Sequence, residues 1–315
     1  MKTGVYILAG GGDHLFEALD PEKLSAKHPN WDYDVRQLAP WSKTVVPGYT
    51  GKESETGAWR SDSAVADSVS LICGRCSSTM DALRILIDAP GLSPWDSLIA
   101  VEQLQGRGQR ESAWSSPPGN LYVSWYWPDL AEVRGAASGW QTMASLLAGE
   151  LTAAALESFG VQVYIKWPND LLINNKKVCG ILVEQRGGHL VVGIGLNLVR
   201  APAREDLRDS MAVPAVSLRE AGPEVSPLQF WQRLSETVRG RFYQLLQAVT
   251  PAAFVKLIER RLAWKGEKVI IRKSRAEVFP AEICGLSPDG GLLISREGVK
   301  ETIYTGSIMP EKEIN

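Results

Sequence analysis

Several short segments of the chain carry residue types that could bind or polarise a ligand. The first is Lys166-Trp167-Pro168-Asn169-Asp170, in which a basic and an acidic residue flank a Trp-Pro pair at the end of an expected strand. Proline fixes φ and removes a backbone donor, so neighbouring side chains are held in place. Asn169 and Asp170 could instead simply cap the turn, and the pentapeptide alone leaves both interpretations open.

The second segment is a glycine-bearing run at residues 106–110, Gly-Arg-Gly-Gln-Arg, which is followed by Trp114. Glycines let the backbone approach a ligand closely, and arginines suit phosphate or carboxylate groups. The segment is not a Walker-type phosphate loop, because the pattern G-x-x-x-x-G-K-[ST] occurs nowhere in the chain. A solvated surface loop is the competing interpretation.

Two further elements lie in expected strands. Gly193 and Gly195 precede Asn197, and glycines inside a strand indicate that a ligand or another backbone passes close by, although a packing reason is the alternative. Lys177 enters an apolar strand that continues through Gly180-Ile-Leu182, where a solvated charge is not expected.

Together, and in this order, these segments resemble the biotin protein ligase family. The resemblance covers about residues 70 to 200, with a looser match in the C-terminal part. The Lys-Trp-Pro-Asn-Asp element separates biotin ligases from their lipoate-handling relatives. The matching elements are Ser78-Thr79, Gln103, Gly106 to Gly108, Trp114, Gly119 to Leu121, Lys166 to Asp170, Lys177, Gly180 to Leu182 and Gly193 to Asn197.

The resemblance implies a set of biotin-binding residues. A neutral fused ring needs a few aimed hydrogen bonds in an otherwise apolar pocket, and Ser78, Thr79 and Gln103 would hold the ureido ring in this way. Arg107 and Lys177 would lie near the biotin carboxylate and the α-phosphate of ATP. The remaining biotin contacts expected from the resemblance are Gly106, Gly180 and Gly195.

The resemblance also implies a nucleotide site and a two-step reaction with ATP and Mg²⁺, without a fixed protein metal site. The biotin carboxylate attacks the α-phosphorus of ATP, pyrophosphate leaves, and a carrier lysine then attacks the mixed anhydride. Lys166 would steady the phosphate or acyl oxygen, and Asp170 would accept the proton of the carrier lysine. Trp114 would belong to a loop that folds over the adenylate. The other nucleotide-binding residues would be Arg110, Asn169 and Asn197.

The chain departs from the family in the loop that usually reads Gly-Arg-Gly-Arg-x-Gly-Arg-x-Trp. Gln109 and Ser112 replace two expected arginines, and Glu111 replaces an expected glycine. A like charge within ~4 Å costs about 1 kcal/mol in water and about 4 kcal/mol at an effective dielectric constant of ~20. We therefore expect this chain to hold biotinyl-adenylate less tightly than typical members, with Arg110 as a compensating cation.

Composition excludes several other classes of protein. The 315 residues are 44% apolar and 22% charged, with a net charge of −2, which is ordinary for a soluble globular protein and not the basic balance of a non-specific nucleic-acid binder. No segment is long and apolar enough to cross a bilayer, and the apolar run at the N-terminus is too short for a signal peptide. We expect a cytoplasmic protein without a membrane partner.

The four cysteines do not predict a disulfide framework. Cys73 and Cys76 have the spacing of a metal or redox pair, but no second pair follows. Buried or half-buried free thiols are the favoured interpretation.

The pattern of elements predicts an α+β fold, a mixed sheet with helices packed on one side, followed by a small SH3-like β-barrel. We expect an N-terminal extension of unknown role at residues 1–65, a catalytic biotin- and ATP-binding domain at 66–263 and the β domain at 264–315. The extension reads mainly as loop and linker after a short strand at Val5 to Leu8 and a short helix from Asp13 to Ala18.

Three functions remain open. The first is a biotin protein ligase that acts on a biotin carboxyl carrier protein. The second is a regulatory protein that binds biotin or its adenylate and transfers poorly, and the third is a lipoate or octanoate ligase of the same fold. We expect no operator binding, because residues 1–65 show no pair of helices with the short turn of that motif. A homodimer is possible in this family, and the sequence does not show it.

Overall fold

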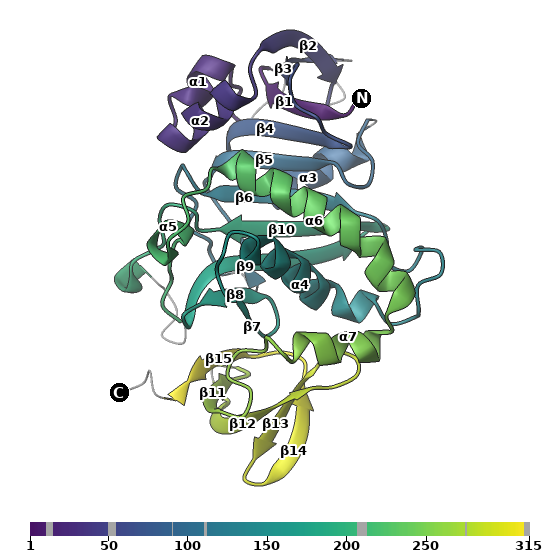
Figure 1. Ribbon diagram of the computed structural model, residues 1–315, viewed down its shortest axis with the longest axis vertical. Helices are drawn as coiled ribbons and strands as arrows, with labels where there is room; N and C mark the ends of the chain where they lie inside the picture. The colour runs from purple at the N-terminus through teal and green to yellow at the C-terminus, as the bar shows by residue number, and fades with distance from the viewer. Residues whose placement is uncertain are drawn as a thin grey trace. The chain divides into compact units, whose positions relative to one another are not determined.

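The computed structural model describes residues 1–10, 15–49, 55–89, 91–109, 112–206, 213–274 and 276–311. The chain forms two compact units that alternate along the sequence (Figure 1). The first unit contains Met1–Asp129, Ile181–Arg200 and Ser217–Gln232, and the second contains Leu130–Gly180, Ala201–Val216 and Arg233–Asn315. The division into three domains made from the sequence stays a prediction.

The first unit is built on a mixed sheet in the order β2-β3-β1-β4-β5-β6-β10-β9. β1 pairs in parallel with β4, and β4 with β5, whereas β6 is antiparallel to both β5 and β10. The strands are β1 (Gly4–Leu8), β2 (Trp41–Pro47), β3 (Glu55–Ser61), β4 (Val69–Cys76), β5 (Ser97–Gln103), β6 (Leu121–Trp127), β9 (Lys176–Arg186) and β10 (His189–Leu196).

Helix α3 (Thr79–Asp88) covers one face of this sheet. Met80, Leu83 and Leu86 recur at three-residue spacing, so they form one apolar stripe, and all three are buried. The stripe packs on β5, β6 and β10. The helix begins directly after β4, which places its N-terminus next to the ends of these strands.

The N-terminal segment corrects the sequence-based interpretation. Instead of loop and linker it contains α1 (Pro21–Ser25), α2 (Pro29–Gln37), β2 and β3, so a pair of helices with a short connection does exist. Pro21 and Pro29 occupy the first turn of their helices, where a missing N–H costs nothing. The expected helix begins at Asp13, outside the described residues, and residues 15–18 are not helical.

The N-terminal segment belongs to the core of the first unit. The side chains of Leu24 and Trp31 are fully buried. Asp34 accepts hydrogen bonds from the hydroxyl of Ser226 and, at 2.9 Å, from the backbone N–H of Leu228 at the start of helix α6 (Pro227–Ala248). The carboxylate therefore caps that helix and ties α2 to it.

The second unit contains the strands that carry Lys166, Asp170 and Lys177. β7 (Tyr164–Lys166), β8 (Asp170–Ile173) and the first half of β9 form consecutive antiparallel pairs. Asn174 and Asn175 both have positive φ in the turn between β8 and β9, as the predicted tight turn requires. The helices of this unit are α4 (Ala144–Glu157), the C-terminal part of α6, and α7 (Pro251–Ile258). The short helices are η2 (Gln141–Met143), η3 (Arg204–Asp206) and, in the first unit, α5 (Leu218–Ala221).

The C-terminal part forms a separate five-stranded antiparallel sheet in the order β14-β13-β12-β11-β15. This agrees with the predicted small all-β module, but no pairing that closes it into a barrel is found among the described residues. Its strands are β11 (Lys268–Arg272), β12 (Val278–Leu286), β13 (Leu292–Arg296), β14 (Val299–Ile303) and β15 (Ser307–Pro310). The α+β fold class is confirmed.

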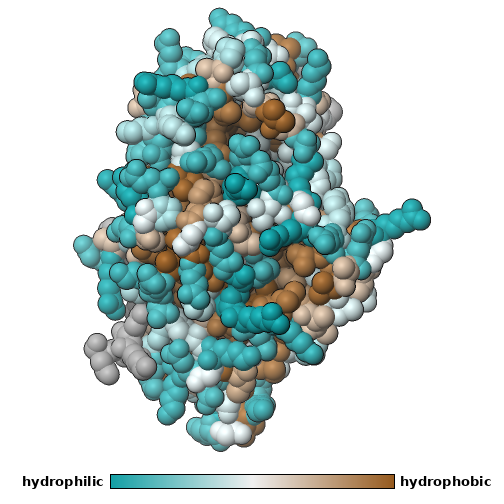
Figure 2. Space-filling view, viewed as in Figure 1, coloured by the Kyte–Doolittle hydropathy of each residue, from teal (hydrophilic) through white to brown (hydrophobic). Residues whose placement is uncertain are grey.

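The surface and the cysteines of the described residues agree with the composition of the chain. None of the helices in the described residues is long and apolar enough to span a membrane, and the face drawn in Figure 2 is mostly hydrophilic, with apolar side chains in patches between the polar ones. Cys73, Cys76 and Cys179 are buried free thiols, and Cys284 is a half-buried one, as predicted.

Candidate active site

The N-terminus of α3 carries a buried polar cluster in the first unit. The Gln103 side-chain oxygen accepts hydrogen bonds from the backbone N–H and the hydroxyl of Thr79, at 2.8 and 3.1 Å. Ser124 donates to the Thr79 hydroxyl at 2.8 Å, and the Gln103 amide donates to Ser116 at 3.0 Å. The cluster brings together Thr79 and Gln103, two of the three residues expected at the biotin ureido ring.

Ser78 completes this cluster with an unused hydroxyl. The residue is 2% exposed, and its Oγ has no hydrogen-bond partner among the described residues. A buried hydroxyl without a partner costs about 1–3 kcal/mol. A polar ligand atom at the N-terminus of α3 would remove this cost, which fits the predicted contact with a ureido group.

The strand glycines make room for side chains of the first unit. A Cβ on Gly195 would lie 2.5 Å from Cε2 of Trp114, so the indole packs directly on the backbone of β10. A Cβ on Gly193 would lie 2.7 Å from the sulfur of Met80. Both glycines therefore have a packing role, which fixes where the tryptophan of the predicted loop lies, and the biotin contact expected of Gly195 stays a prediction.

The loop of residues 106–114 folds back on itself. Trp114 donates from its backbone N–H to the carbonyl of Gly106 at 2.7 Å, and Gly108 donates to Ser112 at 2.7 Å. A Cβ on Gly106 would lie 2.6 Å from the Trp114 carbonyl oxygen, so glycine is required by this close approach. Arg110 and Glu111 lie outside the described residues, and the predictions made for them stay predictions.

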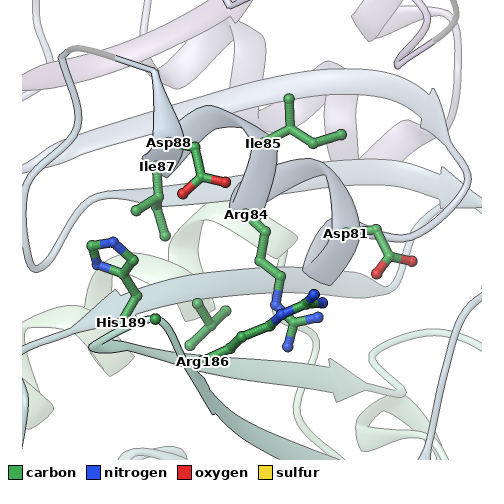
Figure 3. Close-up of a pocket in the computed structure, with 9 residues that line it drawn as sticks. Asp81, Arg84, Ile85, Ile87, Asp88, Arg186 and His189 are labelled. Carbon is green, nitrogen blue, oxygen red and sulfur yellow. The ribbon is translucent and has the colours of Figure 1, made fainter.

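Arg107, at the start of this loop, is held by carboxylates. Its Nη2 donates to Oδ1 of Asp81 on α3 at 2.7 Å and lies 3.6 Å from Oε2 of Glu184 on β9. Beside Asp81, a cavity of about 480 Å³ is lined by α3 residues down to Asp88 and by Arg186 and His189 (Figure 3). None of the residues predicted to bind biotin or ATP lines this cavity.

Asn120 is a residue that the sequence placed in a matching motif without giving it a role. Its side-chain oxygen accepts from three successive backbone N–H groups, those of Leu198, Val199 and Arg200, at 2.9 to 3.2 Å. The buried Asn197 precedes this segment, and its carbonyl accepts from Leu218 at 2.8 Å. Asn120 therefore fixes the backbone that follows Asn197.

The second unit contains a three-residue charge cluster. Asp170 lies between two ammonium groups, with its Oδ2 2.8 Å from Nζ of Lys166 and its Oδ1 2.7 Å from Nζ of Lys177. Lys166 and Asp170 are opposite each other in the β7–β8 hairpin, and Gly180 is opposite Asp170 in β9. The predicted Asn169 is a half-buried residue of the turn that joins β7 to β8.

The local backbone holds these side chains in place. Trp167, in the same turn, is buried and donates from its indole N–H to the carbonyl of Gly290 at 2.9 Å. The backbone of Lys177 is bonded on both sides, donating to Pro214 at 2.7 Å and accepting from Val216 at 2.9 Å.

The electrostatics of this cluster favour an anionic ligand. Burial would raise the pKa of Asp170, but the ammonium groups of Lys166 and Lys177 outweigh that effect and lower the pKa to about 2. Two cations and one anion leave one positive charge in excess, which suits a carboxylate or phosphate. So low a pKa makes Asp170 a weak base, which weighs against its predicted role as proton acceptor.

No group of three or more His, Cys, Asp and Glu side chains that could hold a metal ion is found in the described parts of the chain. A Mg²⁺ ion bound through nucleotide phosphates needs only one or two protein ligands. The residues present are therefore compatible with a metal that arrives with its nucleotide.

Comparison with known proteins agrees with this geometry. Residues 74–198 match the Biotin/lipoate A/B protein ligase family. The chain is 32% identical over 238 residues to the bifunctional ligase/repressor BirA of Salmonella typhimurium, covering 71% of this chain and 70% of that one. It is 31% identical over 243 residues to the biotin–[acetyl-CoA-carboxylase] ligase of Paracoccus denitrificans, covering 74% and 96%.

A solved structure gives the same answer. The biotin protein ligase of Aquifex aeolicus in complex with biotin and ATP is 25% identical and superposes with a TM-score of 0.63, covering 76% of this chain and 97% of that one. The matched family, the coverage of the Paracoccus relative and the shared fold confirm the resemblance seen in the sequence, and the chain belongs to the biotin protein ligase family.

Proposed function

We propose that this chain is an ATP-dependent, AMP-forming biotin protein ligase. It converts biotin and ATP to biotinyl-5'-AMP and pyrophosphate, and then transfers the biotinyl group to a lysine of a biotin carboxyl carrier protein. The observation that carries the proposal is the Lys166–Asp170–Lys177 cluster, in which the Lys-Trp-Pro-Asn-Asp element meets Lys177 of β9 with one positive charge in excess. Membership of the biotin protein ligase family supports it.

In the first step a carboxylate must approach a polyphosphate, so catalysis depends on positioning and positive charge. Ser78, Thr79 and Gln103 hold the ureido ring, and Arg107 and Lys177 offset the charge of the biotin carboxylate and the α-phosphate. Mg²⁺ that arrives bound to ATP would supply positive charge for the leaving pyrophosphate. No enzyme nucleophile is required, because the substrate carboxylate is itself the attacking group.

The second step requires an uncharged carrier lysine next to the mixed anhydride. Asp170 orients Lys166 and Lys177, so that their positive charges stabilise the negative charge that develops on the acyl oxygen and on the departing AMP. Trp114, packed on Gly195, belongs to the loop that shields the adenylate from water. Asn169 and Asn197, with Arg110, contact the nucleotide.

The remaining expectations about the setting are also proposals. The acceptor is a carrier protein with an exposed lysine, and the relatives named as acetyl-CoA-carboxylase ligases support this choice. We place the protein in the cytoplasm, without nucleic-acid or membrane partners, and a homodimer is compatible with the family.

Biotin-dependent exchange of labelled pyrophosphate into ATP tests the proposal, with lipoate as a parallel substrate. We expect exchange with biotin alone, and its loss in Lys177→Ala and Asp170→Ala. Lys176→Ala is the matched control, because the neighbouring Lys176 is exposed. Exchange with lipoate would favour the lipoate ligase, and no exchange with either acid in a folded protein would favour the adenylate-binding regulatory protein.

A further inference from the structure

Arg107 of the first unit is connected to two acidic residues that the family resemblance does not assign. Its guanidinium bonds to Asp81, and Glu184 lies close to the same nitrogen atom. Glu184 is also paired with Arg84, one turn after Asp81 on α3. Figure 3 shows Asp81 and Arg84 on this helix and Arg84 reaching toward Arg186.

The geometry of the contact leaves most of the guanidinium available. Both carboxylate contacts use Nη2, and no hydrogen bond from Nε or Nη1 of Arg107 is found among the described residues. A guanidinium has five N–H donors in a fixed fork, so one nitrogen can be tethered while another edge binds a carboxylate or phosphate. Asp81 and Glu184 therefore fix the direction of the fork without filling it.

The loop holds the backbone of Arg107, which forms a β-bridge with Ala113 between the hydrogen bonds of Gly106 and Gly108. These main-chain contacts do not fix the direction of its long side chain. A long side chain on such a segment loses rotamer freedom when it binds a ligand, and holding it beforehand reduces that loss. The pattern usual in the family has arginines at the positions of Gln109 and Ser112, so the orientation of Arg107 matters more in this chain.

An opposing effect is the repulsion between Asp81 and a substrate anion. Asp81 is about half exposed, with 49% of its side chain accessible. Water therefore screens this repulsion, whereas the hydrogen bond at 2.7 Å acts directly on the guanidinium.

We propose that Asp81, with Glu184, is a positioning residue that orients Arg107 toward the biotin carboxylate and the α-phosphate. The inference rests on the proposed function, because it assigns Arg107 to those anions. Asp81 does not touch the substrate, and its whole effect on binding passes through Arg107.

A double-mutant cycle tests this dependence. Asp81→Asn, Arg107→Ala and the double variant are compared with the wild type for biotin dissociation constant by calorimetry and for KM and kcat in pyrophosphate exchange. Asp81→Asn should weaken biotin binding and raise the KM for biotin about two- to fivefold, the range that a partly exposed ion pair supplies, with a smaller change in kcat. In the Arg107→Ala background the same substitution should change nothing.

The control is Asp88→Asn, an exposed carboxylate on the same helix, which should behave as the wild type. An equal effect of Asp81→Asn in both backgrounds would show that it acts through α3 and would overturn the inference. Tighter biotin binding in Asp81→Asn would show that Asp81 competes with the substrate for Arg107. Unchanged binding would show that the contact does not affect Arg107. Either result would also overturn the inference. A wild type that binds biotin without exchange would refute the proposed ligase activity alone, since the binding cycle still reports on Asp81.

Discussion

Replacing Asp170 with asparagine removes the carboxylate that lies between Lys166 and Lys177. The pKa of Asp170 falls from 3.8 to about 2 in the folded protein, and this difference contributes about 2 kcal/mol to the free energy of unfolding at neutral pH. Removing one partner of a buried ion pair costs about 3–5 kcal/mol. Lys166 is 12% and Lys177 28% exposed, so water reduces that cost, and we expect a loss of about 2–4 kcal/mol.

The pH dependence gives a sharper test than the loss alone. A carboxylate whose pKa is lowered on folding contributes stability above its unfolded pKa, and this contribution is lost as pH falls toward the folded pKa. The difference in unfolding free energy between wild type and Asp170→Asn should therefore be constant from pH 8 to pH 5 and should narrow below about pH 4. Urea unfolding at each pH measures it, with Asp88→Asn as the exposed control.

The same variant separates orientation from proton transfer. If Asp170 acts by orienting Lys166 and Lys177, biotin-dependent pyrophosphate exchange should fall together with transfer to the carrier. If Asp170 acts mainly as the base for the carrier lysine, exchange should survive while transfer is lost. A difference in stability below about 0.5 kcal/mol, the ordinary range of surface substitutions, would refute the description of the cluster.

Three further changes test the loop, the strand and the N-terminal segment. Gln109→Arg should slow the release of labelled biotinyl-adenylate at least fivefold, because one nearby cation supplies about 1 kcal/mol even in water, and an unchanged off-rate would count against the predicted weak retention. Gly195→Ala should lower the free energy of unfolding in urea by about 1–3 kcal/mol, because its Cβ would meet Trp114. Gly240→Ala is the control, since a Cβ there lies in open space on α6, and it should raise the free energy of unfolding by up to about 1 kcal/mol. Burial raises the pKa of Asp34 to about 6, although hydrogen bonds act to lower it. The protonated side chain is therefore the form that favours folding. Its contribution to stability is complete below pH 3.8 and is lost as the pH rises through 6. The free energy of unfolding of Asp34→Asn, measured by thermal unfolding, should therefore rise relative to wild type by up to about 3 kcal/mol between pH 4 and pH 7.5. A difference between the two proteins that does not change with pH would contradict the raised pKa of Asp34.

The sequence predicted the elements whose signals are local. The apolar stripe of α3 is visible in the spacing of Met80, Leu83 and Leu86, and the tight turn in Asn174-Asn175. Trp114 and Lys177 were assigned from ordered motifs rather than from periodicity. The helix and the turn depend on a few neighbouring residues, and the motifs on a long ordered series of segments. Both kinds of signal can be recognised in the sequence without knowing the tertiary contacts.

The N-terminal elements could not be predicted in this way. α1 has five residues and α2 nine, which are too few to establish a helical period. β2 and β3 are held by pairing with each other and with β1. The pairing with β1 joins residues far apart in the sequence, such as Tyr6 and Arg60, so a short window of sequence does not contain it.

The partners of the site residues were equally out of reach. Asp81 and Glu184 are 103 positions apart and meet at Arg107 only because α3 packs on the sheet that contains β9. The pKa of Asp170 depends on burial and on the ammonium groups of Lys166 and Lys177 together. The Lys-Trp-Pro-Asn-Asp element contains Lys166 but not Lys177. Residue types predicted the chemistry of the site, but its electrostatics required the fold.

The contacts of α2 also decide what kind of element the N-terminal segment is. The imidazole of His28 lies so close to Gly119 that a Cβ there would be 2.8 Å from it, and Gly119 precedes Asn120, which fixes the backbone after Asn197. Trp31 is fully buried, and Asp34 caps α6. The buried side chains of α2 face the interior of the first unit, whereas Tyr33 and Arg36 lie on its exposed face. The pair of helices therefore acts as part of the first unit's core.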